Sequence, residues 1–298
     1  MWSLQINIFG MKWKLTQRWS GEEIQIQKIL VNGVELNYIE QGEGDPVVFV
    51  HGSVTDFRIW DPQIEPFSKY YHVIAYSRRY HYPNTWIGDG SDYSPFLHAE
   101  DLAELIKELG LSPVHVVGIS YGASICLSLA AKYPELIRTS VICEPFLLSW
   151  LRDIPGGDSF VESFMTNIYE PIQRAVQSKD LEQSMRIFVD GFLGEGTFDH
   201  LPVEARTMLM DNALEMKAWA LSPDIFKALT RDEARKIRTR TLILTGEFST
   251  KPFRQMVDEL ERCLPNTERA TIPGASHILN VDNPQAFNET VQAFLSKH

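Results

Sequence analysis

The pentapeptide Gly-Ile-Ser-Tyr-Gly occupies residues 118–122, between an apolar run at 114–117 and a run of small and apolar residues at 123–131. This order predicts a strand, a tight turn and a helix. A serine at the tip of such a turn has a strained backbone, and the glycine two residues to either side permits packing that a Cβ would block. The free N–H groups of the following helix point at whatever the serine attacks. We therefore predict that Ser120 is a nucleophile.

The composition fits one large domain, or a core domain with an insertion. The chain has 298 residues, of which 44% are hydrophobic and 22% charged, so it can bury a sizeable core. Its formal net charge of −11 argues against nucleic acid as a partner, because nucleic acid requires a basic face. No stretch is long and apolar enough to span a membrane, and residues 1–18 lack the continuous apolar region of a secretory signal. We therefore expect a cytoplasmic protein without a membrane partner.

The spacing of cysteines and glycines argues against a bound metal or cofactor. Cys126, Cys143 and Cys263 lie far apart without a C-x-x-C pair, as expected for reduced thiols in a cytosolic protein. No group of His, Cys and Asp residues has the spacing of a zinc site. The glycine pair at 88–90 lacks the third glycine and the preceding strand of a dinucleotide-binding loop. We expect no metal, no cofactor and a small-molecule substrate as the partner.

Short apolar runs alternate with amphipathic segments through most of the chain. An Asn-Gly pair at 32–33 predicts a hairpin turn between the first two strands. The run at 47–50 is wholly apolar, which is typical of a parallel strand buried on both faces. This pattern predicts an α/β fold with a mostly parallel, eight-stranded sheet and helices on both faces. The predicted strands are 24–30, 34–39, 47–50, 71–76, 114–117, 139–143, 241–245 and 269–272, and the helices between them include 59–68, 98–109, 254–263 and 284–295.

Residues 146–232 interrupt the alternation because they predict helices only. A helical block inserted between two strands is a candidate cap over a site at the strand ends. We therefore divide the chain into an N-terminal extension (1–22), a core (23–145 and 233–298) and a helical cap (146–232). Within the cap, Trp150 and Trp219 are candidate substrate-binding residues. The helices predicted for the cap are 160–168, 172–177, 181–192, 203–221 and 225–229.

Four short motifs in this order resemble the α/β-hydrolase superfamily. They are His51-Gly52, the 118–122 pentapeptide, Gly246-Glu247 after a strand, and Gly274-Ala275-Ser276-His277 after the last strand. The resemblance covers about residues 24–298 in element order, with the helical block where the cap usually lies. It implies a serine hydrolase with the pentapeptide as its nucleophile elbow.

The resemblance also implies a base and an oxyanion hole for Ser120. A neutral hydroxyl needs a base beside it, and among the eight histidines His277 lies just past the last predicted strand, at the strand ends where the serine also lies. His51 is expected to be a structural part of the oxyanion loop. The oxyanion hole is expected to consist of the backbone N–H groups of Ser53 and Tyr121.

The acid that would orient His277 departs from the usual pattern. The superfamily often carries Gly-Glu-x-Asp after the strand before the last, and here Ser249 occupies the position of the aspartate. Two carboxylates remain as candidates. Glu144, which directly follows the strand at 139–143, is favoured because a charge there must be paired, and Glu247 is the alternative.

An arginine-rich loop at 78–82 follows the strand at 71–76. Its arginines could recognise an acidic group near the site, or they could pair with carboxylates of this acidic chain; the second interpretation is favoured.

The expected activity is hydrolysis of a small to medium, largely apolar carboxylic ester, thioester or lactone through an acyl-enzyme. A lyase, C–C hydrolase or perhydrolase that uses the same residues is an alternative, because one fold hosts all of these reactions. A non-catalytic ligand-binding receptor is a third possibility, and the absence of aspartate at position 249 is its only support in the sequence.

Overall fold

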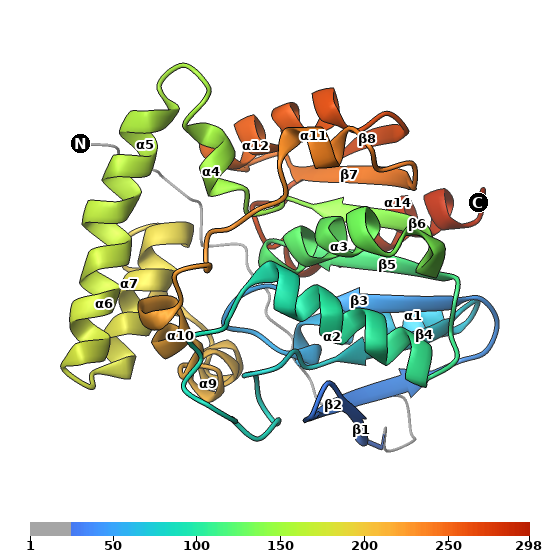
Figure 1. The fold of residues 1–298 in the computed structure, drawn as a ribbon, viewed down its shortest axis with the longest axis horizontal. Coiled ribbons are helices and arrows are strands. Elements are labelled where there is room, and N and C mark those ends of the chain that lie inside the picture. The colour runs from blue at the N-terminus through green and yellow to red at the C-terminus, as the bar shows by residue number, and fades with distance from the viewer. Residues whose placement is uncertain (1–24) are drawn as a thin grey trace.

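The computed structural model describes residues 25–298, so the N-terminal extension predicted at 1–22 lies outside the described residues. The sheet of the described part has eight strands in the order β1-β2-β4-β3-β5-β6-β7-β8. Strands β3 to β8 are parallel, whereas β2 is antiparallel to both of its neighbours. This is the mostly parallel α/β sheet that the sequence predicts (Figure 1). The strands are β1 (Gln27–Val31), β2 (Val34–Gln41), β3 (Pro46–Val50), β4 (His72–Tyr76), β5 (Val114–Ile119), β6 (Ile137–Cys143), β7 (Arg240–Gly246) and β8 (Thr267–Ile272).

Helices cover both faces of the sheet, as the sequence predicts. On one face, α2 (Pro95–Glu108), α3 (Tyr121–Lys132) and α12 (Lys251–Cys263) contribute to the larger hydrophobic core. On the other face, α1 (Asp61–Ser68) and α14 (Pro284–Leu295) pack against each other and belong to a second core. Two short α-helices, α11 (Arg231–Ala234) and α13 (Leu279–Asp282), and two 3-10 helices at Phe57–Trp60 and Pro134–Leu136 complete this part of the chain.

Helix α2 begins three residues before the predicted start, and local capping explains the difference. Ser94 is the N-cap, and its hydroxyl accepts a hydrogen bond from the backbone N–H of Leu97. Pro95 takes the first helical position, where its missing N–H costs no hydrogen bond. The cap and the proline therefore move the start of the helix to Pro95.

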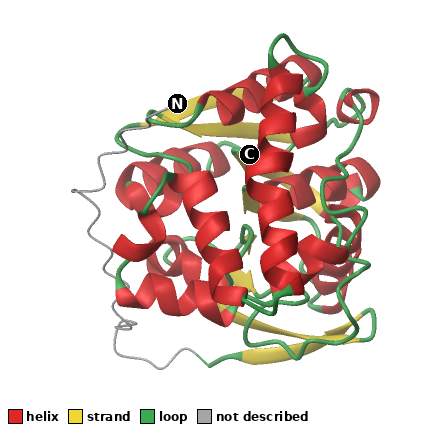
Figure 2. Ribbon diagram, turned by 90° about the vertical axis from the view of Figure 1, so that its left-hand side faces the viewer, coloured by secondary structure: helices red, strands yellow, loops and turns green. Residues whose placement is uncertain are grey.

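The segment between β6 and β7 is helical and forms a layer at one end of the sheet. Figure 2 looks onto this end and shows helices in front of the strands. No helix in residues 25–298 is long and apolar enough to cross a membrane. The cap helices are α4 (Leu148–Leu151), α5 (Gly157–Phe164), a π-helical turn (Met165–Tyr169), α6 (Glu170–Gln177), α7 (Leu181–Leu193), α8 (Thr197–His200), α9 (Val203–Asp211) and α10 (Glu215–Leu221).

Two of the predicted cap helices are wrong. The helix predicted at 203–221 is broken between α9 and α10, because the Asn212 side chain turns toward the core: it donates to Asp56 at 2.7 Å and accepts from the Tyr82 N–H at 2.9 Å. The segment predicted as a helix at 225–229 is a turn followed by irregular chain. Ile225 and Leu229 are buried without helical backbone, and five residues are too few to form a stable helix on propensity alone.

Candidate active site

Ser120 lies at the tip of the turn between β5 and α3. Its backbone angles are φ 55° and ψ −120°. A positive φ is rare for residues other than glycine and marks a strained backbone. A Cβ on Gly118 would lie 2.6 Å from the Gly122 carbonyl oxygen, and a Cβ on Gly122 would lie 2.2 Å from the Val50 carbonyl oxygen. Both glycines are therefore required by close backbone contacts.

His277 is hydrogen-bonded to Glu144. Its Nδ1 lies 2.8 Å from Oε2 of this carboxylate, which is fully buried at the end of β6. The other carboxylate oxygen accepts from the Thr245 hydroxyl and from the Gly246 N–H, both at 2.9 Å. Burial alone would raise the pKa of Glu144, but the hydrogen bond and charge of His277 outweigh it and lower the pKa below its usual value. The carboxylate is thus ionised and accepts from the imidazole. The Phe253 ring stacks on His277 with 3.9 Å between ring centroids.

The alternative acid, Glu247, lies elsewhere. Its side chain is exposed, and it accepts a hydrogen bond at 2.8 Å from the Gly274 N–H, in the turn that leads toward His277. Ser249, at the usual aspartate position, is buried beside Glu144, and its hydroxyl contributes to the lowered pKa of that carboxylate. The structure therefore brings Glu144, and not Glu247, to the imidazole of His277.

Ser120 and His277 line one cavity of about 90 Å³ between the strand ends and the cap. No lysine, arginine, aspartate or glutamate is among its lining residues, so His277 is its ionisable group. The cavity surface is almost entirely apolar. The cap contributes Phe188, Val189, Phe192, Leu193, Leu201, Ala205, Met208 and Leu209 to the lining.

Neither of the two candidate tryptophans lines this cavity. Trp150 is buried, and its Nε1 donates to the Leu229 carbonyl oxygen at 2.8 Å. Trp219 is also buried and packs edge-on against Phe188, with 5.1 Å between ring centroids. Trp219 therefore supports a lining residue from behind, and the lining itself is built from phenylalanine and aliphatic side chains.

The two amides expected to form the oxyanion hole come from two elements that meet at Ser120, namely α3 and the loop after β3. Tyr121 is the first residue of α3, so its N–H has no partner within the helix. Ser53 lies in the loop after β3 and lines the cavity with Ser120. This loop packs closely on the nucleophile, because a Cβ on Gly52 would lie 3.3 Å from the Ser120 Cβ. Both amides are therefore near the serine, as an oxyanion hole requires.

The arginines of the 78–82 loop pair within the protein, in agreement with the favoured interpretation. Arg79 forms a bidentate pair with Asp101, with both N–O distances at 2.7 Å. Arg78 is buried, and its backbone N–H donates to Nε2 of His51 at 2.9 Å. Burial and the positive charge of Arg78 hold the pKa of His51 well below its usual value, so this imidazole is neutral. His51 is a structural residue of the loop.

Sequence reasoning missed Glu215, a fully buried carboxylate at the start of α10. One signal could have found it: a single acid on a helical segment that is followed by apolar residues one, three and four positions later, at Met216, Ala218 and Trp219. The partners of Glu215 could not be found in this way, because they come from two distant loops, the loop after β3 and the connection between β4 and α2. Among residues 25–298, no cluster of three His, Cys, Asp or Glu side chains is placed to hold a metal ion.

Comparison with known proteins places the chain in a family. It is 24% identical over 269 residues, or 89% of this chain and 96% of the relative, to the (E)-2-((N-methylformamido)methylene)succinate hydrolase of Acinetobacter baylyi. It is 25% identical over 90% of its length, and 94% of the relative, to the 2-(acetamidomethylene)succinate hydrolase of Mesorhizobium japonicum.

Solved structures share the fold at low sequence identity. An enol-lactonase from Burkholderia xenovorans superposes with a TM-score of 0.75 at 22% identity, covering 91% of this chain and all of the other. An epoxide hydrolase from Vigna radiata gives a TM-score of 0.76 at 20% identity, covering 94% of this chain and all of the other. The family model for the alpha/beta hydrolase fold matches residues 45–284. The chain therefore belongs to the α/β-hydrolase fold family.

Proposed function

We propose that this protein is a serine hydrolase that cleaves a small to medium, largely apolar carboxylic ester, thioester or lactone. One observation carries the proposal: the His277 imidazole is hydrogen-bonded to the buried carboxylate of Glu144 and lines the same apolar cavity as Ser120. A strained serine, a histidine and a carboxylate are the parts needed for nucleophilic acyl transfer.

In the proposed reaction, Oγ of Ser120 attacks the carbonyl carbon while Nε2 of His277 takes the hydroxyl proton. Glu144 accepts from Nδ1–H, which leaves the lone pair on Nε2 free for this task and stabilises the imidazolium that forms. The carbonyl oxygen becomes negatively charged and accepts from the N–H groups of Ser53 and Tyr121. Removing one such donor typically costs about 3 kcal/mol of transition-state stabilisation.

The tetrahedral intermediate then collapses to an acyl-enzyme. The bond to the leaving group breaks, and His277 returns its proton to the departing alcohol or thiol. Water next attacks the acyl carbon, with His277 again taking the proton, and Ser120 leaves with that proton restored. The net change is one water consumed and one acid and one alcohol or thiol released, or one hydroxy acid from a lactone.

The lining of the cavity supports a substrate that is neutral around its reacting carbonyl. The two relatives named above are hydrolases of substituted succinates, which carry two carboxylates. A carboxylate placed among Phe192, Met208 and their apolar neighbours here would have no cation to pair with. Because an unpaired buried charge is costly, we expect this chain to favour uncharged acyl groups.

A second candidate uses the same residues on a bond other than that of a simple ester. The two sequence relatives are hydrolases of methylene-substituted succinates, and one structural neighbour is an enol-lactonase. These names favour an activated substrate and keep the C–C hydrolase alternative open beside the ester. The receptor interpretation loses its support from the sequence, because Glu144 supplies the carboxylate that position 249 lacks.

A fluorophosphonate probe tests the proposal directly. We expect stoichiometric labelling at Ser120 in the wild-type protein and none in the S120A variant. A panel of p-nitrophenyl esters of increasing acyl length would then define the substrate range. A folded wild-type protein that the probe does not label would refute the proposal.

A further inference from the structure

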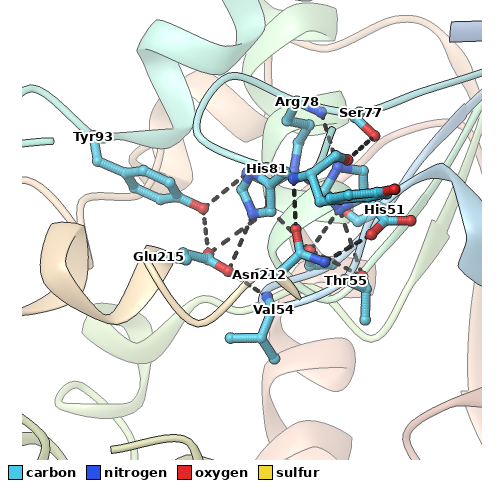
Figure 3. A network of polar contacts seen from close by, with 12 residues as sticks. His51, Val54, Thr55, Ser77, Arg78, His81, Tyr93, Asn212 and Glu215 are labelled. Carbon is cyan, nitrogen blue, oxygen red and sulfur yellow. Dashed lines mark hydrogen bonds and ion pairs between the residues drawn. The ribbon is translucent and has the colours of Figure 1, made fainter. Parts of the chain in front are cut away.

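Glu215 is a carboxylate of the cap that is buried against the core beside the oxyanion loop. It lies at the start of α10 and has no exposed surface. One of its oxygens accepts from the backbone N–H of Val54, and the other accepts from the Tyr93 hydroxyl. Figure 3 shows the carboxylate between these two partners, with the imidazole of His81 beside it. Three segments distant in sequence thus meet at one side chain.

The guanidinium of Arg78 supplies positive charge beside this carboxylate, because its Nη2 lies 3.8 Å from Oε1. Nε2 of His81 lies 3.1 Å from Oε2, but burial and the charge of Arg78 lower the pKa of this imidazole below its usual value. Burial would raise the pKa of Glu215, but His81, Arg78 and the Tyr93 hydroxyl outweigh it and lower the pKa to about 2. The hydroxyl of Tyr93 also accepts from Nη1 of Arg78 at 2.9 Å, so Tyr93 bridges the two charged groups. Glu215 and Arg78 therefore form one buried ionic unit.

This unit holds both peptide groups next to Ser53. Nη2 of Arg78 donates to the Gly52 carbonyl oxygen at 2.9 Å. Because a trans peptide is planar, the N–H of Ser53 then points away from that carbonyl, in the opposite direction. On the other side of Ser53, Glu215 accepts from the N–H of the next peptide, at Val54. The amide expected to stabilise the oxyanion therefore belongs to one of the two peptides that this ionic unit fixes.

The conformation of Val54 shows why such restraint is needed. Its φ is 53°, in the left-handed region that is unfavourable for a β-branched residue. A strained residue persists only when its surroundings hold it in place, and such residues concentrate at functional sites. This backbone N–H donates to the carboxylate of Glu215, and that contact with the cap holds it in place.

We propose that Glu215 is a positioning residue through which the cap orients the oxyanion loop. In this role it acts through Ser53 and Val54 and does not touch the substrate. The inference rests on the proposed serine hydrolase function, and it makes that function depend on contact between α10 and the core. A cap that lacks this carboxylate would still cover the cavity, but the Val54 N–H and the guanidinium of Arg78 would both lose their contact with Glu215, so the restraint on the Ser53 N–H would weaken.

The rate at which a p-nitrophenyl phosphonate reacts with Ser120 tests the inference, because the phosphoryl oxygen develops charge where the oxyanion forms. We expect E215Q to react 10- to 100-fold more slowly and to show a similar fall in kcat on p-nitrophenyl butyrate, with KM changed less than threefold. The matched control is D101N, which weakens the neighbouring buried pair with Arg79 but makes no contact with the oxyanion loop. Its kcat should stay within threefold of wild type, whatever its melting temperature.

A second variant keeps the test decisive if E215Q is unstable. Glycine adopts a positive φ at low cost, so V54G removes the backbone strain at this position. The conformation that Glu215 is inferred to hold would then need less restraint. We expect E215Q/V54G to recover at least fivefold in kcat over E215Q. Equal phosphonylation rates for wild type and E215Q, or no recovery in the double variant, would overturn the inference while leaving the proposed function standing. Failure of the wild-type protein to react at Ser120 would instead overturn the proposed function and this inference with it.

Discussion

Nδ1 of His277 lies 2.8 Å from Oε2 of Glu144. Glu144 directly follows β6, whereas the usual position of the acid is in the turn after the neighbouring strand, β7. Neighbouring parallel strands end at the same edge of the sheet, so a carboxylate after either strand can reach one imidazole. In this chain the turn after β7 carries Ser249, and the carboxylate comes from the adjacent strand. The proposed triad thus keeps its chain order of serine, acid and histidine while the acid changes strand.

The first prediction concerns this acid. E144Q should lower kcat by about 10³- to 10⁴-fold, because an amide cannot stabilise the imidazolium and favours the wrong tautomer of His277. E247Q is the matched control, and its kcat should stay within a few fold of wild type, since Glu247 is exposed and bonds only the turn at Gly274. Steady-state kinetics on a p-nitrophenyl ester, with circular dichroism to confirm folding, measures both. The assignment would be wrong if E144Q kept near-native turnover.

The second prediction uses the buried serine at the usual aspartate position. The E144Q/S249D double variant should have a kcat at least tenfold higher than E144Q alone. Position 249 lies beside the Glu144 carboxylate and therefore close to His277. S249N in the same background is the control, since it has nearly the same size and no charge. Equal turnover of the two double variants would show that position 249 cannot serve the imidazole.

The third prediction concerns charge in the cavity. The kcat/KM for p-nitrophenyl butyrate should exceed that for mono-p-nitrophenyl succinate, with the same acyl length, by about 100-fold or more, because the second carboxylate has no partner in the lining. L201R should narrow this ratio, since Leu201 lines the cavity at a partly exposed position that can keep an arginine hydrated. Similar values for the two esters in the wild-type protein would contradict the neutral-substrate proposal.

The fourth prediction separates two glycines. G122A should destabilise the fold by about 3 kcal/mol or more, because its Cβ would lie 2.2 Å from the Val50 carbonyl oxygen in a core that cannot relax. G33A should cost about 1 kcal/mol, since Gly33 has a positive φ but no atom within 4 Å of the added Cβ. Urea unfolding of each variant compares the two losses. A loss for G122A no larger than that for G33A would argue against the close contact.

The fifth prediction concerns acid stability. The pKa of Glu215 is depressed to about 2, so its contribution to stability is present above the pKa of the unfolded chain and is lost as the pH falls through the folded value. The wild-type protein should therefore have a larger free energy of unfolding than E215Q at pH 6. The difference between the two should become smaller by roughly 1–2 kcal/mol when the pH is lowered to 3. Urea titrations across this range measure the difference. A pH-independent gap would show that the carboxylate is not ionised in the folded protein.

Local signals were enough to predict the strands and the serine turn. The wholly apolar run of β3 is typical of a strand buried on both faces, and the glycines of the turn mark close backbone contacts. The Asn32-Gly33 turn is equally local, because both residues adopt the positive φ that their types permit.

Features that depend on distant contacts could not be predicted in this way. The break at Asn212 arises from bonds to two core loops, which no helical periodicity records. Trp150 and Trp219 were plausible lining residues by composition, but packing against other cap residues keeps both of them out of the cavity. The role proposed for Glu215 depends on partners 122 and 161 residues away, so only the folded chain could suggest it.

The contact between Gly122 and the carbonyl oxygen of Val50 has a consequence for how this protein can diversify. It holds the start of α3 in direct backbone contact with the end of β3. The distance between the serine and the oxyanion loop is therefore set by the backbone and not by the surrounding side chains. The apolar lining, by contrast, comes mostly from α7 and α9 in the cap. Under the proposed function, reactivity and selectivity are thus carried by separate parts of the chain. Mutational libraries aimed at new substrates belong in the lining of α7 and α9, where the reactive geometry is least disturbed.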